Sequence, residues 1–484
     1  MSSEPKPRIV LIVADGPLMA GLPQQLAGRN AIHIPIASPP LPLAAIATTI
    51  VTGVSPIAHG IVTKSTVDSG TLEIRKVVVE DRHFQALWDG TNFRVKLINW
   101  PATEGDSKVT SYECRDEFEQ AKSCLDADIL GIVLPRPARD QHAPIEVQST
   151  EKKLEEFLSE LSLETNVLIV HRGTTGVATT TQAQHPMYAS FLVNKCEYET
   201  NQNSFWELIG GATYVLAGVT CPAGVKMPSW SFISTIEIKG EKPFPLNSTI
   251  DEVDWPEVIR RLVESDKNSG IVLLTQRFTS LVFVSYKKQL WEDLEYNSAC
   301  LVQLRGKPFE FWMLILALEQ QGKSEELQVI VAQLQKLYPE GYLTSIALCL
   351  TQLDEDKCRE HLLKVDISKL GVHYALGAFG RMCLKAGLEE QGIEAISLAM
   401  QKGVAQFPDR AKLAQYFYAK EQYKEALHVL GRVGLASGEI SWQVLRLNIL
   451  IELDDADAVI EQASKVLHQN PSHELALNAI NKYT

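Results

Sequence analysis

Three side chains of this chain have the residue type and position that metal chemistry at the end of a strand requires. Asp15 follows the apolar run 9–13, and His171 follows the apolar run 166–170. His142 comes after a third such run. Carboxylates and neutral imidazoles are the ligands that zinc and manganese accept in proteins. Asp15, His142 and His171 therefore predict a site for one divalent ion, provided that the fold brings them together.

Neighbouring residues add to this hypothesis and offer alternatives to it. Asp140 lies beside His142 and supplies a second carboxylate. Arg172 is permanently cationic, so it cannot ligate a metal, but it can hold an anionic ligand at the end of a strand. The plainer interpretations are that Asp15 caps a helix and that Arg172 is a solvent-exposed side chain.

The elements that would position these residues belong to an α/β domain. Short apolar, β-branched runs alternate with amphipathic stretches, which favours a mostly parallel sheet with helices on both faces. The predicted strands are Ile9 to Val13, Val95 to Ile98, Ile129 to Leu134, Val167 to Val170, Tyr188 to Val193 and Ile271 to Leu274. The predicted helices are Leu43 to Val51, Asp81 to Trp88, Lys152 to Leu161 and Ser204 to Leu216.

Composition restricts the classes of partner. The 484 residues include 46 Lys and Arg against 59 Asp and Glu, a formal net charge of -13, with no concentrated basic block. This balance argues against nucleic acid as the main partner. No apolar run approaches the ~20 residues that span a bilayer, and the first run is too short for a signal peptide. Because the eight cysteines are scattered, we expect free thiols in the cytoplasm rather than disulfides or a zinc site.

One motif carries a resemblance to a known family. The segment Thr52-Gly53-Val54-Ser55-Pro56-Ile57-Ala58-His59-Gly60-Ile61, together with Asp15 after the first strand, resembles the alkaline phosphatase superfamily. The sulfatase and type I phosphodiesterase/nucleotide pyrophosphatase branches are the most similar. Weaker landmarks follow in the same order at 98–103, 204–219 and 289–295. The resemblance implies an alkaline phosphatase-like fold over residues 1–305.

The same resemblance implies a chemistry whose residues are mostly replaced here. Family members hold two divalent metals, or one calcium, and use a Thr, Ser or modified Cys as nucleophile. That nucleophile position is Leu43, which has no heteroatom with which to attack phosphorus or sulfur. Ala138 stands for a ligand Asp ahead of His142, and the Asp-His pair after the late strand is His171-Arg172. His59 and the buried-helix residues Thr48 and Thr49 are interpreted as structural.

The remaining chain, 306–484, has a different pattern and resembles tetratricopeptide repeats. From Pro308 onward it is helical in pattern, with turn signals at 338–341, 407–409 and 470–472, close to two units of ~34 residues apart. About four or five degenerate helix pairs are expected, although an irregular helical bundle is the alternative. Repeats of this kind present a concave face, which implies a protein partner.

The sequence thus favours a catalytically inactive alkaline-phosphatase-type domain joined to a protein-binding arm, with no cofactor. Its alternative is a metal-dependent hydrolase of phosphate or sulfate esters, using zinc, manganese or calcium on rearranged ligands.

Overall fold

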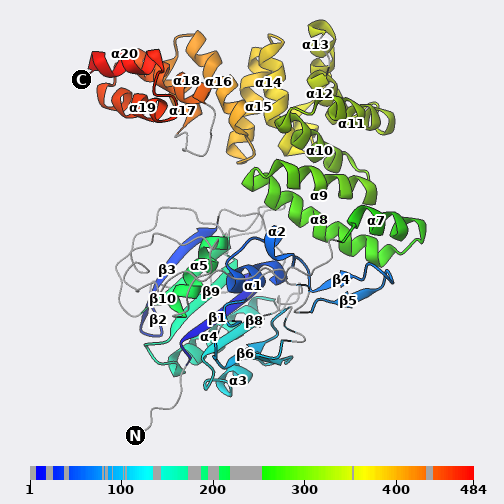
Figure 1. The fold of residues 1–484 in the computed structure, drawn as a ribbon, viewed down its shortest axis with the longest axis vertical. Coiled ribbons are helices and arrows are strands. Elements are labelled where there is room, and N and C mark those ends of the chain that lie inside the picture. The colour runs from blue at the N-terminus through cyan, green and yellow to red at the C-terminus, as the bar shows by residue number, and fades with distance from the viewer. Residues whose placement is uncertain are drawn as a thin grey trace. The chain divides into compact units, whose positions relative to one another are not determined.

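The fold is taken from a computed structural model that describes most of the chain (Figure 1). The described residues are 7–17, 25–36, 43–78, 81, 86–89, 91–101, 103, 106–134, 143–172, 187–193, 206–217, 253–351, 354–431 and 440–483. By its internal contacts the chain divides into two compact units, Met1–Gly306 and Lys307–Thr484.

The first unit is built around an eight-stranded sheet. Its strands are β1 Ile9–Pro17, β2 Gln25–Leu26, β3 Arg29–Ile36, β6 Val95–Ile98, β7 Val109–Tyr112, β8 Ile129–Leu134, β9 Asn166–Arg172 and β10 Met187–Val193. They lie in the order β2-β3-β10-β9-β1-β8-β6-β7. The five strands from β9 to β7 are mutually parallel, while β10 runs antiparallel to both β9 and β3. The prediction of a mostly parallel sheet is therefore confirmed.

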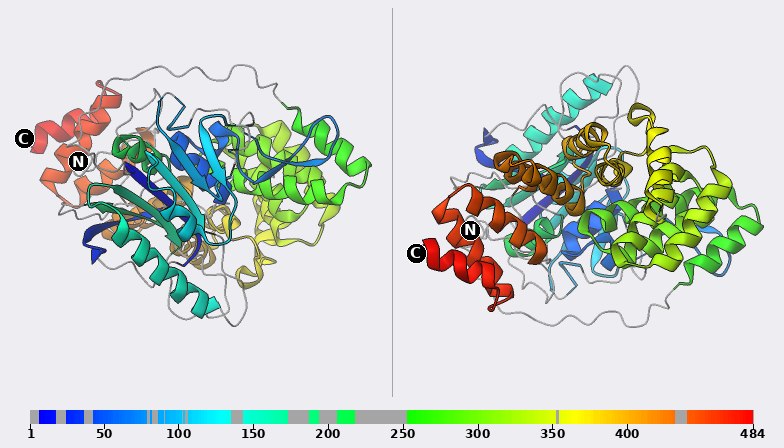
Figure 2. Two further views of the ribbon diagram at one scale, coloured as in Figure 1. Left: turned by 90° about the horizontal axis from the view of Figure 1, so that it is seen from below. Right: turned by 90° about the horizontal axis from the view of Figure 1, so that it is seen from above.

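Helices cover both faces of this sheet, as Figure 2 shows. They are α1 Leu43–Thr52, α2 Pro56–His59, α3 Glu117–Lys122, α4 Ala143–Glu160 and α5 Trp206–Leu216. Alternate residues of β1 enter two separate cores, because successive side chains of a strand point to opposite faces. Leu11 packs in the core that contains α1 and α5, and Ile12 packs in the one that contains α3 and α4.

The last part of this unit is helical and holds a small hairpin in place. The hairpin pairs β4, Ser65–Val67, with β5, Ile74–Lys76. It is followed in sequence, much later, by α7 Trp255–Glu264, α8 Asn268–Lys288 and α9 Trp291–Leu304. Arg261 of α7 donates to the carbonyls of Ser69 and Gly70, both at 3.0 Å, and the Lys267 ammonium lies 2.6 Å from Glu73. These contacts fix the hairpin that later supplies two lysines to a cleft.

In this region one strand prediction is wrong, and one helix prediction is wrong at its end. Ile271 to Leu274 lies inside α8, where Leu274, Phe278 and Leu281 are buried at helical spacing. A four-residue apolar run does not distinguish a buried strand from one face of a helix. In the stretch predicted as helix from Asp81 to Trp88, residues 87 and 88 form a turn, and 82–85 lie outside the described residues. Among the described residues, the helices that follow the sheet therefore begin at Trp255, earlier than the helical pattern expected from Pro308.

The second unit is entirely helical in its described residues. Its helices are α10 Pro308–Gln321, α11 Ser324–Leu337, α12 Tyr342–Thr351, α13 Glu355–Leu363, α14 Leu376–Lys385, α15 Glu389–Gln401, α16 Phe407–Ala419, α17 Tyr423–Leu430, α18 Ile440–Glu452, α19 Ala456–Gln469 and α20 Glu474–Tyr483. Two short 3-10 turns, Ile367–Lys369 and His373–Ala375, precede α14.

These helices repeat as pairs. The first helix of each pair begins at Pro308, Tyr342, Leu376, Phe407 and Ile440, and the final helix begins at Glu474, so successive starts are 34, 34, 31, 33 and 34 residues apart. Each first helix contacts its own second helix and also the first helix of the next pair. The arrangement is a helical repeat whose first helices form one continuous layer.

Close crossings within the repeat depend on small residues. A Cβ atom on Gly380 of α14 would lie 2.5 Å from Cγ1 of Ile396 and 2.9 Å from the carbonyl oxygen of Gly392, both on α15. Ala395, Ala399, Ala411 and Ala426 are fully buried. Small residues therefore allow the paired helices to pack closely.

An ionic network ties three of the first helices together. The Arg381 guanidinium on α14 donates to Asp409 of α16 at 2.6 Å and to Glu319 of α10 at 3.0 Å. The Asp409 side chain is 3% exposed and also accepts the Gln406 backbone N–H at 2.7 Å. Burial raises the pKa of Asp409, although Arg381 and Gln406 oppose that shift. The network therefore couples the first, third and fourth helix pairs.

Candidate functional site

Sequence reasoning placed a candidate metal site at the carboxyl ends of β1 and β9. Asp15 lies in β1 and His171 in β9, two neighbouring parallel strands. Val13 stands opposite Val170 and Pro17 stands opposite Arg172, with an irregular register between them. The backbone thus brings Asp15, His171 and Arg172 to one edge of the sheet.

The side chains of this candidate site are not described. Those of Asp15, His171 and Arg172 lie outside the described residues, as do His142 and Asp140 entirely. In the described part of the chain, no three His, Cys, Asp or Glu side chains gather as metal ligands do. The metal hypothesis stays a prediction.

The position that the sequence resemblance assigns to a nucleophile is the first residue of a helix. Leu43 begins α1, and the hydroxyls deeper in that helix are committed to structure. Thr48 donates to the Ala44 carbonyl at 2.8 Å, and Thr49 shares a 2.9 Å hydrogen bond with His59. Thr48 and Thr49 are 2% and 0% exposed, which supports their interpretation as packing residues.

The motif at 52–61 forms a compact connection between helices. Gly53 has a φ of 71°, in the left-handed region that glycine occupies without strain. It also lets α5 approach, because a Cβ on Gly210 would lie 2.6 Å from the Gly53 Cα. Ser55 caps α2, Pro56 occupies its first turn, and Gly60 ends it with a φ of 78°. The backbone conformation at each position therefore explains why that residue type occurs there.

His59 is the buried centre of this connection. Its Nδ1 accepts the Ile61 backbone N–H at 3.1 Å, so the neutral ring carries its proton on Nε2 and donates it to the Thr49 hydroxyl. The residue is 0% exposed. With both ring nitrogens engaged in the fold, His59 acts as a structural residue, in agreement with its interpretation from sequence.

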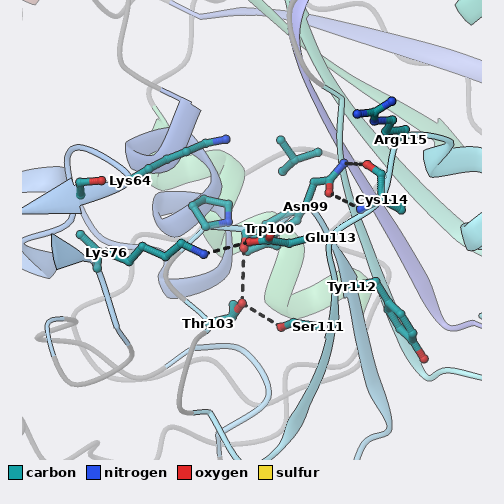
Figure 3. Close-up of a pocket in the computed structure, with 14 residues that line it drawn as sticks. Lys64, Lys76, Asn99, Trp100, Thr103, Ser111, Tyr112, Glu113, Cys114 and Arg115 are labelled. Carbon is teal, nitrogen blue, oxygen red and sulfur yellow. Dashed lines mark hydrogen bonds and ion pairs between the residues drawn. The ribbon is translucent and has the colours of Figure 1, made fainter.

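A cleft of 860 Å³ lies elsewhere, at the carboxyl ends of β6, β7 and β8 (Figure 3). The chain leaves β6 towards β7 on one side, whereas it leaves β8 across β1 to reach β9 on the other. Connections that depart in opposite directions define the topological switch point at which open parallel sheets bind ligands. Its lining residues are Lys64, Ser65, Lys76, Val77, Asn99, Trp100, Pro101, Thr103, Ser111, Tyr112, Glu113, Cys114, Arg115 and Val133.

One wall of the cleft is a tryptophan that packs against a glycine. Trp100 follows β6 and is 7% exposed. Its indole packs across β8 at Gly131, where an added Cβ would lie 2.8 Å from the Trp100 ring and 2.5 Å from Leu97. Gly131 is therefore required for the ring to lie flat against the sheet.

Asn99 joins the two strand ends that border the cleft. Its backbone adopts a φ of 53°, which asparagine tolerates better than most residues. The amide nitrogen donates to the Cys114 carbonyl at 3.0 Å and to Glu117 at 2.9 Å, and the amide oxygen accepts the Cys114 N–H at 3.0 Å. Asn99 thus positions the cleft and has little capacity left to bind a ligand.

The cleft is rich in cations. Lys64 and Lys76 extend from the β4–β5 hairpin, and Arg115 follows β7 (Figure 3). Glu113 is the single acidic residue among the described residues of the lining, and it lies 3.3 Å from the Lys76 ammonium. That ion pair is well exposed, with side chains 67% and 84% accessible, so it is weak. Among the described residues, Lys64 and Arg115 have no carboxylate within ion-pair distance.

A pair of hydroxyls lies beside these cations. Thr103 Oγ1 donates to the Trp100 carbonyl at 3.3 Å and lies 2.9 Å from Ser111 Oγ. With the threonine proton used in this way, the serine donates to the threonine, and the serine lone pairs face the cleft as acceptors.

The thiol at the edge of the cleft is not a nucleophile. Burial raises the pKa of Cys114, and the carboxylates of Glu117 and Asp116 raise it further. Burial likewise raises the pKa of Glu117. Because the thiolate is the reactive form, Cys114 stays protonated and inert at neutral pH. The cleft therefore offers charge and hydrogen bonds for binding, without an activated nucleophile among its described side chains.

Comparisons with known proteins assign no family. No family model matches this chain, and no curated protein matches it either. Among solved structures, the chain is similar to one in the crystal structure of the APC/C hetero-tetramer Cut9-Hcn1, with a TM-score of 0.34 and 11% sequence identity. The similarity covers 49% of this chain and 50% of that chain, so it spans about half the length of each. None of the helices in the described part is both long and apolar enough to cross a membrane.

The sequence motifs indicate the carboxyl ends of β1 and β9, whereas the cleft lies at the carboxyl ends of β8, β6 and β7, which follow β1 in the sheet. Asn99, Trp100 and Thr103 were noticed only as a family landmark. Lys64 and Lys76 carry no local pattern, and they reach the cleft because the hairpin folds over the end of β6. The segment Asn99-Trp100-Pro101 directly follows a buried strand, and this position is the feature of the sequence that indicates the cleft.

Proposed function

We propose that this chain is a non-catalytic binding protein. In this proposal residues 1–305 form an inactive domain of the alkaline phosphatase type, and residues 306–484 form a tetratricopeptide-like arm that binds a protein partner. The observation that carries the proposal is the regular start of the first helices, every 31 to 34 residues from Pro308 to Glu474. A repeat of ~34 residues built from two helices is the tetratricopeptide period.

The layer of first helices supports protein binding by the arm. Stacked repeats that share one continuous inner layer present an extended surface to a partner. The Arg381 network makes that layer rigid across α10, α14 and α16. A rigid surface loses less conformational freedom on binding than a flexible one does.

The residues near the carboxyl ends of β1 and β9 support the proposal that the first domain is catalytically inactive. Leu43, at the start of α1, offers no atom for nucleophilic attack. Arg172 ends β9 where a metal ligand would be needed, and a guanidinium cannot ligate a cation. The residue types present therefore do not fit the two-metal site of that superfamily.

One observation favours the alternative, a metal-dependent hydrolase of phosphate or sulfate esters. Asp15 and His171 lie on adjacent parallel strands at the same edge. Together with His142 they supply a chemically adequate donor set for zinc or manganese. Metal content and ester turnover separate this alternative from the binding protein.

A cytoplasmic location is part of the proposal. It rests on the six described cysteines, Cys114, Cys124, Cys300, Cys349, Cys358 and Cys383, which are all free thiols. Free thiols are typical of a reducing compartment.

Lysine cross-linking of the full-length chain tests the arm. The chain is purified from its source cells with bound proteins and treated with a bifunctional succinimidyl ester, and linked peptides are identified by mass spectrometry. Lys385 of α14 and Lys412 of α16 lie on first helices, whereas Lys336 of α11 and Lys424 of α17 lie on second helices. We expect links from Lys385 and Lys412 to the partner. Links confined to Lys336 and Lys424, or no co-purified protein at all, would contradict the proposal.

A further inference from the structure

We propose that the cleft at the carboxyl ends of β6, β7 and β8 binds a small organic oxyanion that also carries hydroxyl groups. The oxyanion is a phosphate monoester or a carboxylate on a polyhydroxylated carbon skeleton. This inference is independent of the proposed role of the helical arm.

The position and size of the cleft suit a small molecule. It lies at the topological switch point between β6 and β8, where the connections leave in opposite directions. Its volume of 860 Å³ lies within the range of about 300–1,000 Å³ that small-molecule sites occupy. The sheet therefore provides a concave site at the point where the connections from β6 and β8 leave in opposite directions.

The charge of the lining selects an anion. Among the described lining residues, three side chains are cationic, Lys64, Lys76 and Arg115, and one is acidic, Glu113, in a chain whose formal net charge is -13. A local excess of positive charge in an acidic protein attracts anions to this place rather than to the surface in general. Ammonium and guanidinium groups make their strongest hydrogen bonds with phosphate and carboxylate oxygens.

The ion pair between Lys76 and Glu113 is weak enough for an incoming anion to displace Glu113. The two groups are 3.3 Å apart and mostly solvated, so their attraction is small. An incoming oxyanion can take the place of Glu113 beside Lys76, and Glu113 is free to turn to solvent. In the unliganded protein, Glu113 therefore competes with the ligand for Lys76.

The hydroxyl pair explains why the ligand carries hydroxyl groups. Ser111 Oγ has used its proton on Thr103, so it presents acceptors that match a ligand O–H. Figure 3 shows Thr103 and Ser111 side by side near the Lys76 and Glu113 pair. A ligand with an anionic end and a hydroxylated body satisfies both groups at once.

Isothermal titration of the full-length chain tests this proposal with four probes. D-ribose 5-phosphate and D-gluconate carry both an anion and hydroxyls, whereas D-ribose lacks the anion and inorganic phosphate lacks the hydroxyls. We expect binding of ribose 5-phosphate, of gluconate, or of both, with inorganic phosphate weaker and ribose undetectable. The stronger of the first two identifies the anion as phosphate or carboxylate. Failure of both to bind, or equal binding of ribose, would overturn the proposal.

Three variants locate the binding. Lys64→Met with Lys76→Met is expected to weaken the affinity at least tenfold, since each lost charge-assisted contact removes about a factor of ten. Glu113→Gln is expected to tighten it about two- to fivefold, because the competing carboxylate is gone. Lys152→Met, on the exposed face of α4, is the matched control and should bind as the parent does.

Circular dichroism and thermal unfolding confirm that the variants are folded, which we expect because all the substituted side chains are exposed. Unchanged affinity in the double lysine variant, or weaker binding by Glu113→Gln, would show that the anion does not occupy this cleft.

Discussion

Replacing Arg381 with methionine should destabilise the helical repeat strongly. Met has nearly the length of the arginine stem, so the substitution keeps much of the packing and removes the guanidinium. Asp409 then loses its 2.6 Å partner and Glu319 loses its paired hydrogen bonds. Asp409 cannot turn away to solvent, because its carboxylate is packed against Gly377 and holds the Gln406 N–H.

The expected magnitude follows from the burial of the three groups. Removing one partner of a buried ion pair costs about 3–5 kcal/mol of unfolding free energy. The Asp409 side chain is 3% exposed, so the full cost of an unpaired buried charge applies to it. The Glu319 side chain is 18% exposed, so water partly compensates its loss of a partner. We therefore expect a loss of about 3 kcal/mol. Adding Asp409→Asn to Arg381→Met should restore part of this loss, because the stranded charge is then removed.

The loss should depend on pH with a defined sign. Burial already raises the pKa of Asp409 in the folded protein, and removal of Arg381 raises it further. A carboxyl group whose folded pKa exceeds its unfolded value stabilises the fold as pH falls from the folded pKa towards the unfolded one. The deficit of Arg381→Met should therefore be complete at neutral pH and shrink as the solution is acidified.

Urea denaturation followed by far-UV circular dichroism measures this effect in the full-length chain. Hydrogen exchange of α14 and α16 peptides assigns it to the network. Lys465→Met, which breaks the exposed Lys465 and Glu461 pair on α19, is the control and should change little. A deficit below about 0.5 kcal/mol for Arg381→Met, or one equal to that of the control, would refute the reasoning.

Three further substitutions test the packing of the first unit. Gly131→Ala should cost about 1–3 kcal/mol and change the tryptophan fluorescence, because its Cβ meets the Trp100 ring; an unchanged melting temperature would contradict this. Gly210→Ala should cost at least about 2 kcal/mol, since its Cβ meets the backbone of α1, which cannot rotate away, and parent-like urea denaturation would exclude that contact. His59→Ala should lose about 3 kcal/mol by leaving the Ile61 N–H and Thr49 hydroxyl unpaired in a cavity, and parent-like thermal stability would show that the histidine is dispensable.

The strands and the helical periodicity were predictable because their signals are local. The apolar runs of β1, β8 and β9 are rich in β-branched residues and are bounded by polar or turn residues, and together these features indicate strands. The repeat was visible because prolines recur near helix starts, as Pro408 does in the first turn of α16. The segment Ile271 to Leu274 was misread because its helical periodicity appears only over the whole of α8.

The cleft and the ionic network were not predictable because they depend on long-range pairing. Arg381 lies 28 residues from Asp409 and 62 residues from Glu319, and no spacing rule links them. Lys76 and Glu113 are 37 residues apart and meet only because the hairpin folds over the ends of β6 and β7. The order of strands in the sheet decides which loops meet, and a single sequence does not contain that order explicitly.

Ester turnover by the purified full-length chain tests the central claim of a non-catalytic protein most directly. The chain is assayed with p-nitrophenyl phosphate, bis(p-nitrophenyl) phosphate and p-nitrophenyl sulfate in the presence of zinc, manganese or calcium, beside Asp15→Asn and His171→Ala variants. We expect no turnover above that of either variant, because Leu43 provides no nucleophile. Metal-dependent turnover that both variants abolish would contradict the account and establish the chain as a hydrolase with rearranged ligands.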